Sequence, residues 1–146
     1  MGGFGFCGKI GTITQMILVA DTNTFLAVAL EEPEKSWLVE ATRGAELAAP
    51  AVLPFEVGNA LSAMVKRGRL AVAEALEAWD VIAKLPFRCI EVDGRGAVEL
   101  AAKWKIYAYD AYFLQCARQL ACPLLTLDRG MSRIARKLDI GLLEKP

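Results

Sequence analysis

The stretch Ile17-Leu-Val-Ala-Asp21 decides the fold of this chain, because four consecutive apolar residues run directly into an acidic one. A strand with one face in water alternates apolar and polar residues, whereas a strand buried in a parallel sheet is apolar throughout. The side chains of Asp21-Thr-Asn-Thr24 are of the types that cap helix N-termini, which predicts a helix beginning near Phe25. The stretch therefore indicates one strand–helix unit of a parallel α/β sheet.

The same pattern recurs near the C-terminus, where Pro123-Leu-Leu-Thr-Leu-Asp128 is again an apolar strand that ends in an aspartate. Between and after these strands, apolar runs predict three more, at Glu46–Ala51, Phe87–Val92 and 141–143. Helical periodicity and helix-ending Gly and Pro residues predict the remaining helices at Ser36–Arg43, 55–67, Val72–Leu85, Arg95–Trp104, Asp110–Leu120 and Ser132–Leu138. Strands alternating with helices imply an α/β fold, a three-layer α/β/α sandwich around a central, mostly parallel sheet.

Length and composition are those of one globular domain. The chain has 146 residues, of which 55% are hydrophobic and 23% charged, enough apolar material for a core. We assign residues 16–146 to this domain and interpret the glycine-rich residues 1–15 as a flexible leader or an upstream start, with an edge strand over Lys9–Thr14 as the weaker alternative. No apolar run approaches the roughly 20 residues that span a bilayer, so we expect no membrane association.

Charge and residue usage exclude several kinds of function. Seventeen basic and seventeen acidic residues give a net charge of zero, which removes the simplest argument for a nucleic-acid-binding protein. The chain has no histidine, which excludes Ser-His-Asp triads and His-ligated zinc. Its four cysteines show no C-x-x-C spacing, and we interpret them as reduced packing residues of a cytoplasmic protein: Cys7, Cys89, Cys116 and Cys122.

Two aspartates stand where ligands bind in open α/β sheets. Asp21 and Asp128 each follow a strand, and the carboxyl ends of such strands border the binding crevice. Asn23 and Thr126 are their polar neighbours, and groups of this kind commonly hydrogen-bond carboxylates and orient them. We therefore expect both acids in one pocket, with Asn23 and Thr126 in support.

Two further acids, Glu56 and Asp110, begin predicted helices. Taken alone, either one is better explained as a cap that the helix dipole stabilises. Taken with Asp21 and Asp128, they make a set of carboxylates that repel one another unless some protonate or a cation neutralises them. Oxygen ligands without histidine or cysteine favour Mg2+ or Mn2+, and such metals activate water for phosphodiester hydrolysis.

Four segments resemble the motifs of the PIN-domain ribonucleases, in particular the VapC-like toxins of toxin–antitoxin pairs. They stand in that family's order and at similar spacing, over Met16 to about Glu144: Ile17-Leu-Val-Ala-Asp-Thr-Asn23, Pro54-Phe-Glu-Val-Gly-Asn-Ala-Leu61, Tyr109-Asp-Ala-Tyr112 and Leu125-Thr-Leu-Asp128. The resemblance implies a Mg2+ or Mn2+ site in which Asp21, Asp110 and Asp128 bind metal and Glu56 is a fourth catalytic acid. It further implies endonucleolytic cleavage of single-stranded RNA by a metal-activated water, a homodimer and a cognate antitoxin that blocks the site.

Residues outside the acidic set have competing interpretations. Arg129 and Arg133 follow Asp128 and are candidates for RNA phosphate contacts, or equally for solvated residues of a helix. The three tryptophans are better explained as core or interface anchors than as base-stacking platforms: Trp37, Trp79 and Trp104. One helix carries both Val72, Leu76 and Trp79 and the acids Glu74, Glu77 and Asp80, which we interpret as its solvated face.

Alternative functions differ in what they require of the sequence. A haloacid-dehalogenase-like phosphatase needs a second aspartate where Asn23 stands, and a phosphoacceptor receiver domain needs an aspartate after a middle strand, which here ends at Pro50. Two alternatives share the fold itself: an RNA-processing nuclease without a toxin role, and a non-catalytic module that binds nucleic acid or a partner. The second of these predicts the loss of a core acid, and all three aspartates are present.

Overall fold

The computed structural model describes residues 15–146, so the predicted leader lies, but for Gln15, outside the described residues, as does Cys7. The strands are β1 (Ile17–Ala20), β2 (Glu46–Pro50), β3 (Arg88–Ile90), β4 (Leu124–Leu125) and β5 (Leu142–Leu143). The helices are α1 (Thr22–Ala29), α2 (Lys35–Ala41), α3 (Leu53–Lys66), α4 (Val72–Lys84), α5 (Gly94–Trp104), α6 (Ala108–Leu120) and α7 (Arg129–Lys137). The predicted alternation of strands and helices is confirmed.

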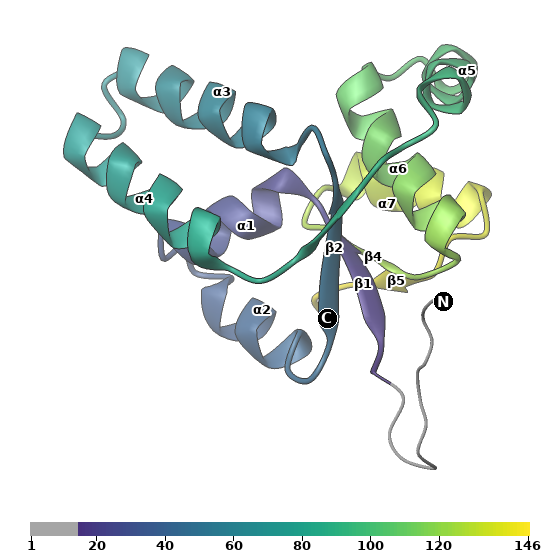
Figure 1. The fold of residues 1–146 in the computed structure, drawn as a ribbon, viewed down its shortest axis with the longest axis horizontal. Coiled ribbons are helices and arrows are strands. Elements are labelled where there is room, and N and C mark those ends of the chain that lie inside the picture. The colour runs from purple at the N-terminus through teal and green to yellow at the C-terminus, as the bar shows by residue number, and fades with distance from the viewer. Residues whose placement is uncertain (1–14) are drawn as a thin grey trace.

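The five strands form one sheet in the order β3-β2-β1-β4-β5, and every pairing is parallel. Helices α1–α4 lie on one side of this sheet and α5–α7 on the other, which confirms the three-layer α/β/α sandwich (Figure 1). The chain runs outward from β1 in opposite directions, toward β2 and toward β4. The topological switch point, where open α/β sheets bind ligands, therefore lies beyond the carboxyl ends of β1 and β4.

Two helices begin earlier than predicted because aspartates cap them. Asp21 accepts a hydrogen bond from the Thr24 backbone N–H at 3.0 Å, so α1 begins at Thr22 instead of near Phe25. Asp128 likewise caps α7, which begins at Arg129 instead of Ser132. Both acids thus combine a position next to a strand with the role of an N-cap.

Strand β4 and the starts of α3 and α6 also differ from prediction. β4 covers Leu124–Leu125 only, because Thr126 turns its hydroxyl toward polar groups at the end of the sheet, and Asp128 lies in the following loop. Helices α3 and α6 begin before Glu56 and Asp110, which therefore lie within the first turns. All four acids still lie at the same end of the sheet.

The predicted orientation of α4 is wrong in part. Ala75, Ala78 and Ile82 are the residues that it buries, whereas Val72 and Leu76 are each 61% exposed. The helix packs against α1 and α3 through a face of mostly small side chains. The approach to α3 is close, since a Cβ added to Gly58 of α3 would lie 3.8 Å from the Trp79 ring. The helix therefore presents apolar side chains to solvent beside its acids.

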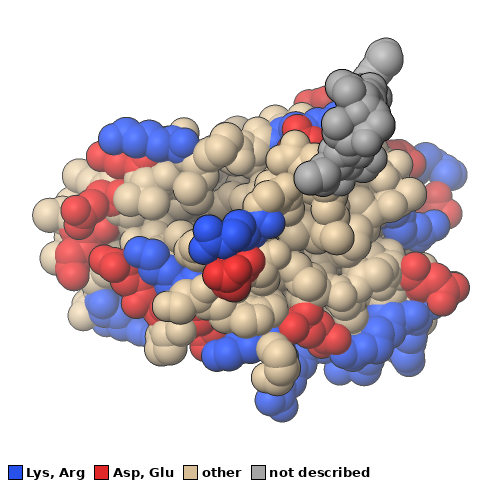
Figure 2. Space-filling view, turned by 90° about the horizontal axis from the view of Figure 1, so that it is seen from below, with Lys and Arg blue, Asp and Glu red and all other residues tan. Residues whose placement is uncertain are grey.

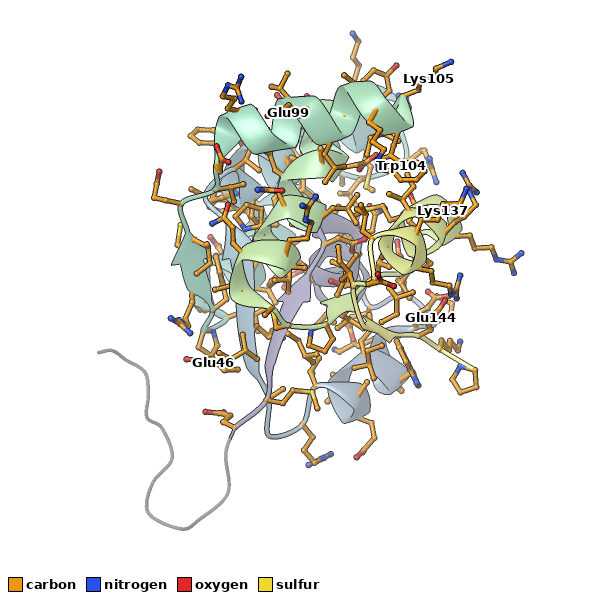
Figure 3. The ribbon with its side chains drawn as sticks, turned by 90° about the vertical axis from the view of Figure 1, so that its right-hand side faces the viewer. Glu46, Glu99, Trp104, Lys105, Lys137 and Glu144 are labelled. Carbon is orange, nitrogen blue, oxygen red and sulfur yellow. The ribbon has the colours of Figure 1, made fainter. Side chains whose placement is uncertain are left out.

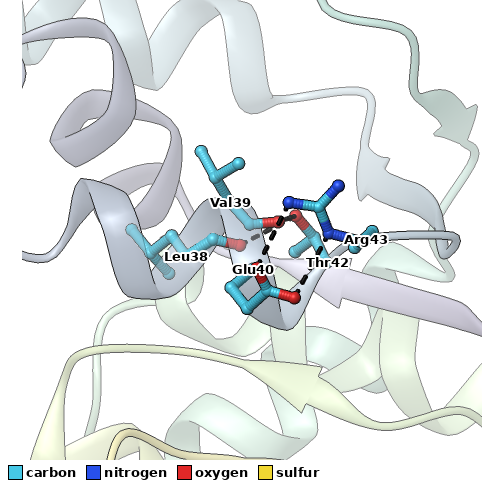
Figure 4. A network of polar contacts seen from close by, with 5 residues as sticks. All are labelled: Leu38, Val39, Glu40, Thr42 and Arg43. Carbon is cyan, nitrogen blue, oxygen red and sulfur yellow. Dashed lines mark hydrogen bonds and ion pairs between the residues drawn. The ribbon is translucent and has the colours of Figure 1, made fainter.

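Contacts at the C-terminal ends of α2, α5 and α7 involve none of the four predicted acids. The Thr42 hydroxyl donates to the Leu38 carbonyl at 2.8 Å, and Glu40 pairs with Arg43 at 3.2 Å at the end of α2 (Figure 4). On the opposite side of the sheet, Trp104 of α5 lies beside Lys137 of α7 (Figure 3), whose ammonium is 5.4 Å from the indole centroid. These contacts join neighbouring segments and leave the carboxyl end of the sheet free.

Charges of both signs are interspersed over the face of the molecule seen from below, with no large basic patch on it (Figure 2). This distribution agrees with the net charge of zero. Within residues 15–146, no helix is both long enough and apolar enough to cross a membrane.

Candidate active site

A pocket of about 210 Å³ opens at the topological switch point. We call it the acidic pocket, because all four predicted acids line it: Asp21, Glu56, Asp110 and Asp128. They come from the end of β1, the first turns of α3 and α6, and the N-cap of α7. The structure therefore brings together side chains that are up to 107 positions apart in the sequence.

Asp21 is the most buried of the four, with only 4% of its surface exposed. One carboxylate oxygen accepts from the Thr24 backbone N–H, and the other accepts from the hydroxyl of Thr126. Burial raises the pKa of Asp21 to about 6, against the opposing effect of these hydrogen bonds, and the charges of Asp128 and Asp110 raise it further. A cation in the pocket would offset both the cost of burying the negative charge and the repulsion between the carboxylates.

Asp128 is held by backbone groups. Its Oδ1 accepts from the N–H groups of Gly130 at 2.7 Å and Met131 at 3.1 Å. Its own N–H donates to the Thr126 hydroxyl at 2.9 Å, the same hydroxyl that donates to Asp21. Thr126 thus positions through one oxygen atom both Asp21 and Asp128, which we call the strand-end acids because they follow β1 and β4 along the chain. Asp128 Oδ2 stays available to a ligand.

The two helix-borne acids are less constrained. Thr22 donates its hydroxyl to Glu56 Oε1 at 2.6 Å, which leaves the second oxygen of Glu56 without a partner among the described residues. The Asp110 side chain makes no hydrogen bond or ion pair within residues 15–146. Burial raises the pKa of both carboxyls, and the neighbouring charges, Asp110 for Glu56 and Asp128 for Asp110, add to the effect.

Comparison with known proteins agrees with this geometry. The family model described as the PIN domain matches residues 18–137, which span the whole sheet except β5 and the first residue of β1. The chain belongs to the PIN-domain family.

Relatives of this PIN domain include named ribonucleases. This chain is 29% identical over 119 residues to Ribonuclease VapC9 of Mycobacterium tuberculosis, and the match covers 80% of this chain and 89% of that protein. Among solved structures, PAE2754 from Pyrobaculum aerophilum has a TM-score of 0.67 at 21% identity and covers 87% of this chain and 83% of that one. VapBC2 from Rickettsia felis, solved bound to a promoter DNA fragment, has a TM-score of 0.64 at 15% identity over 88% of this chain and 98% of that one. These two likenesses support the fold.

The donor set of this PIN domain fits a hard divalent cation. Four carboxylates supply only oxygen, and at least three of them carry a carboxylate oxygen that no described residue occupies: Glu56, Asp110 and Asp128. Within residues 15–146, however, no three acidic or cysteine side chains are already gathered closely enough to enclose an ion. The fit therefore rests on the donors, the shared pocket and the raised pKa values.

The supporting residues predicted from sequence occupy different places. Thr126 hydrogen-bonds Asp21, whereas Asn23 is exposed, lines the acidic pocket and makes no hydrogen bond with any described carboxylate. Arg129 lines a neighbouring cavity of about 630 Å³ instead, which we call the side cavity. Arg133 is exposed on α7 and is in neither lining.

Four residues of the acidic pocket were missed by sequence reasoning. Thr22 binds Glu56, while Asn59 lines the wall one helical turn after Glu56. Phe55 and Tyr109 flank the opening with 75% and 53% of their surfaces exposed. All but Asn59 stand directly beside a predicted acid in sequence, and Asn59 follows Glu56 at the i+3 spacing that places two side chains on one helix face.

Proposed function

We propose that this PIN domain is a Mg2+- or Mn2+-dependent endoribonuclease that cleaves single-stranded RNA. The observation that carries the proposal is the convergence of the four acids on one pocket, with pKa values raised by burial and mutual repulsion in three of them. The names of its curated relatives, which are ribonucleases, support the same activity.

Each acid has a separate task in this proposal. A bound Mg2+ or Mn2+ would supply Lewis-acid activation of a water and neutralise charge on the phosphodiester. Asp21, held from two sides, and Asp128, held by backbone groups, provide oxygen atoms in set positions. Asp110 is free to approach the ion, while Glu56 orients the attacking water or binds the metal directly.

The aromatic side chains beside the pocket suit single-stranded RNA. Phe55 and Tyr109 expose flat rings next to the acids, and unpaired bases stack on such rings. Arg129 supplies positive charge on the side-cavity wall, and exposed Arg133 lies one turn further along α7. No basic residue of the described chain lines the acidic pocket itself, so the metal would supply much of the attraction for phosphate.

The activity is tested with fluorescently labelled single-stranded RNA in Mg2+, Mn2+ or EDTA. We expect cleavage that requires the metal and is lost in Asp110→Asn. Asp80→Asn is the matched control, because Asp80 is an exposed aspartate on α4 outside the acidic pocket. Cleavage that persists in EDTA or in Asp110→Asn, or a wild type that cuts no RNA across a broad panel, would refute the proposal.

We also propose that the protein acts in the cytoplasm as the toxin of a toxin–antitoxin pair. A toxin–antitoxin complex from Klebsiella pneumoniae and the FitAcB structure from Neisseria gonorrhoeae share its fold. Expression of this chain should arrest growth, and co-expression of a small neighbouring gene should restore it. Normal growth at high expression, with RNA cleavage intact in vitro, would reject the toxin role alone.

A homodimer is the proposed assembly. Val72, Leu76 and Trp79 recur at helical spacing on α4 and are at least 39% exposed, which a soluble monomer rarely tolerates as a cluster. Light scattering should give twice the chain mass for the wild type and a single chain mass for Leu76→Glu. A monomeric wild type at the concentrations used for cleavage would refute the dimer.

A further inference from the structure

The side cavity lies next to the acidic pocket and shares Asn23 with it. Its volume of about 630 Å³ is three times that of the acidic pocket and within the size range of small-molecule sites. Leu26 and Met64 give it apolar walls. Its polar lining comes from the start of α1, the loop between α1 and α2, Thr126, α7 and the segment after β5. It therefore has room for a nucleoside beside the place where the phosphodiester would bind.

Ser132 is a buried polar residue that the fold does not explain. Its side chain is 4% exposed and lines the side cavity, and its hydroxyl forms no hydrogen bond within residues 15–146. Among the described residues, Trp104 Nε1 is the polar side-chain atom that is both inaccessible to solvent and without a hydrogen-bond partner. The Ser132 hydroxyl also lacks a partner, so it must be partly accessible, and the side cavity is where it is exposed. An accessible hydroxyl without a protein partner is free to donate a hydrogen bond to a ligand in the cavity and to accept one.

Two carboxylates that line the side cavity are also without partners among the described residues. Glu32 and Glu34 line the side cavity from the loop between α1 and α2, and neither side chain makes a hydrogen bond or ion pair among the described residues. Glu34 is only partly exposed and, although it stands at the N-cap of α2, its side chain makes no capping hydrogen bond. Both carboxylates are therefore available as acceptors.

Resting on the proposed ribonuclease activity, we infer that the side cavity binds the nucleobase next to the scissile phosphodiester, and that it prefers guanine. The guanine edge carries two adjacent N–H donors, which a carboxylate such as Glu34 accepts in parallel. Ser132 and Asn23 can serve the ring acceptors, and Met64 packs on the ring face. In single-stranded RNA this edge is free to bind protein.

Glu144 also lines the side cavity but is paired with Arg136, so within residues 15–146 the unpaired side-chain charges of the lining are two of each sign. Arg129 and Lys145 line it together with the glutamates, and neither forms an ion pair within the described residues. These cations would attract the phosphate of a nucleotide. Carboxylates for the base and cations for the phosphate are both present, as a nucleotide requires.

The first experiment measures binding of 5′-GMP and 5′-AMP to the metal-free wild-type protein by NMR titration. We expect GMP to bind about tenfold more tightly than AMP. Glu34→Gln should remove this preference, and Ser132→Ala should weaken GMP binding about fivefold, since it deletes one hydrogen bond. Glu40→Gln and Ser62→Ala are the matched controls, because both residues are exposed and already engaged outside the cavity.

A second experiment compares cleavage of two single-stranded oligoribonucleotides that differ by one guanine-to-adenine change. Wild type should favour the guanine substrate, and Glu34→Gln should cleave both alike. GMP binding that depends on Glu34 would support the base site even if no RNA were cleaved. RNA cleavage with equal GMP and AMP affinities, or binding of an arginine-rich peptide in place of GMP, would overturn the inference and leave the ribonuclease proposal standing.

Discussion

The strand-end acids, which cap α1 and α7, and the acids within the first turns of α3 and α6 are held in different ways. Asp21 and Asp128 are hydrogen-bonded to backbone N–H groups and to one shared threonine hydroxyl. Glu56 has a single hydroxyl partner, and Asp110 has none among the described residues. The strand-end pair is therefore part of the fold, while the helix-borne pair is available to respond to a ligand.

This difference teaches that one pocket can contain both preset and adjustable ligands. The preset Asp21 carboxylate is costly in the metal-free protein, because burial opposes its charge, as its raised pKa shows. The adjustable carboxylates, Glu56 and Asp110, have oxygen atoms free to complete the site when the ion arrives. Substitutions should therefore separate activity from stability differently in the two pairs.

The largest effect is expected from Asp110→Asn, which should lower the cleavage rate about a thousandfold, because a neutral amide stabilises a bound metal and its developing charge poorly. Its melting temperature should stay close to that of the wild type, since Asp110 has no partner to lose. Rates come from single-turnover cleavage and melting from circular dichroism. A large loss of stability would remove the distinction between the two pairs.

Asp21→Asn should also abolish cleavage, but it should stabilise the metal-free fold at pH 7 by up to about 3 kcal/mol. Folding raises the pKa of Asp21 from 3.8 to about 6, so the folded state binds more protons in this window. The free energy of unfolding of the wild type should therefore fall as pH rises from 4 to 6, and the variant should lack this fall. Urea unfolding at several pH values measures both, and a parallel decline in wild type and variant would contradict the argument.

Magnesium should reverse the wild-type loss. At pH 7 the ion binds the ionised pocket and stabilises the folded state by mass action. We expect a rise in melting temperature with Mg2+ for the wild type that is much reduced in Asp21→Asn. Equal rises in both proteins would show that the ion binds elsewhere.

Thr126→Val should reduce metal affinity by about tenfold to a hundredfold, the usual range for a residue that orients a metal ligand. The change keeps the side-chain shape but removes the donor to Asp21 and leaves the Asp128 N–H without its acceptor. Isothermal titration with Mn2+ measures the affinity. Thr126→Ser, which retains the hydroxyl, should recover most of it, and failure to do so would attribute the effect to packing.

The smallest effect is expected from Thr22→Val, which should slow cleavage only about threefold. Thr22 holds one oxygen of Glu56, and this carboxylate is half-buried, so solvent replaces much of the lost hydrogen bond. A loss of Mn2+ affinity as large as that for Thr126→Val would mean that Glu56 is as strictly positioned as Asp21. The comparison of strand-end and helix-borne acids would then fail.

Much of this fold is readable from the sequence because the parallel strands are short, continuously apolar runs. The same reasoning predicted all four acids of the pocket, since a position after a strand or within a first helical turn is a local property. Helix starts at Thr22 and Arg129 were missed, because any residue of Asp21–Thr24 could have been the cap and Asp128 was interpreted only as a site residue. Apolar spacing alone also failed to show that α4 buries alanines and exposes Leu76, which depends on how closely α3 approaches.

Relations between distant residues stayed beyond sequence reasoning. The hydrogen bond from Thr126 to Asp21 joins positions 105 apart, and that from Thr22 to Glu56 joins positions 34 apart. Arg129 and Arg133 stand near Asp128 in sequence, yet the direction of α7 places Arg129 at the side cavity and Arg133 in neither cavity. Local pattern gives no distance across a sheet.

The short outer strands of the sheet bear on how this protein behaves at high concentration. β5 pairs over Leu142–Leu143 only, and β3 covers three residues that begin with Arg88, which pairs with Glu46 of β2. An exposed edge with many free backbone groups is a template on which another chain can add a strand, and short or charged edges prevent this. Within residues 15–146 the sheet thus ends on both sides in short strands, which disfavour the addition of a strand from another copy of the chain.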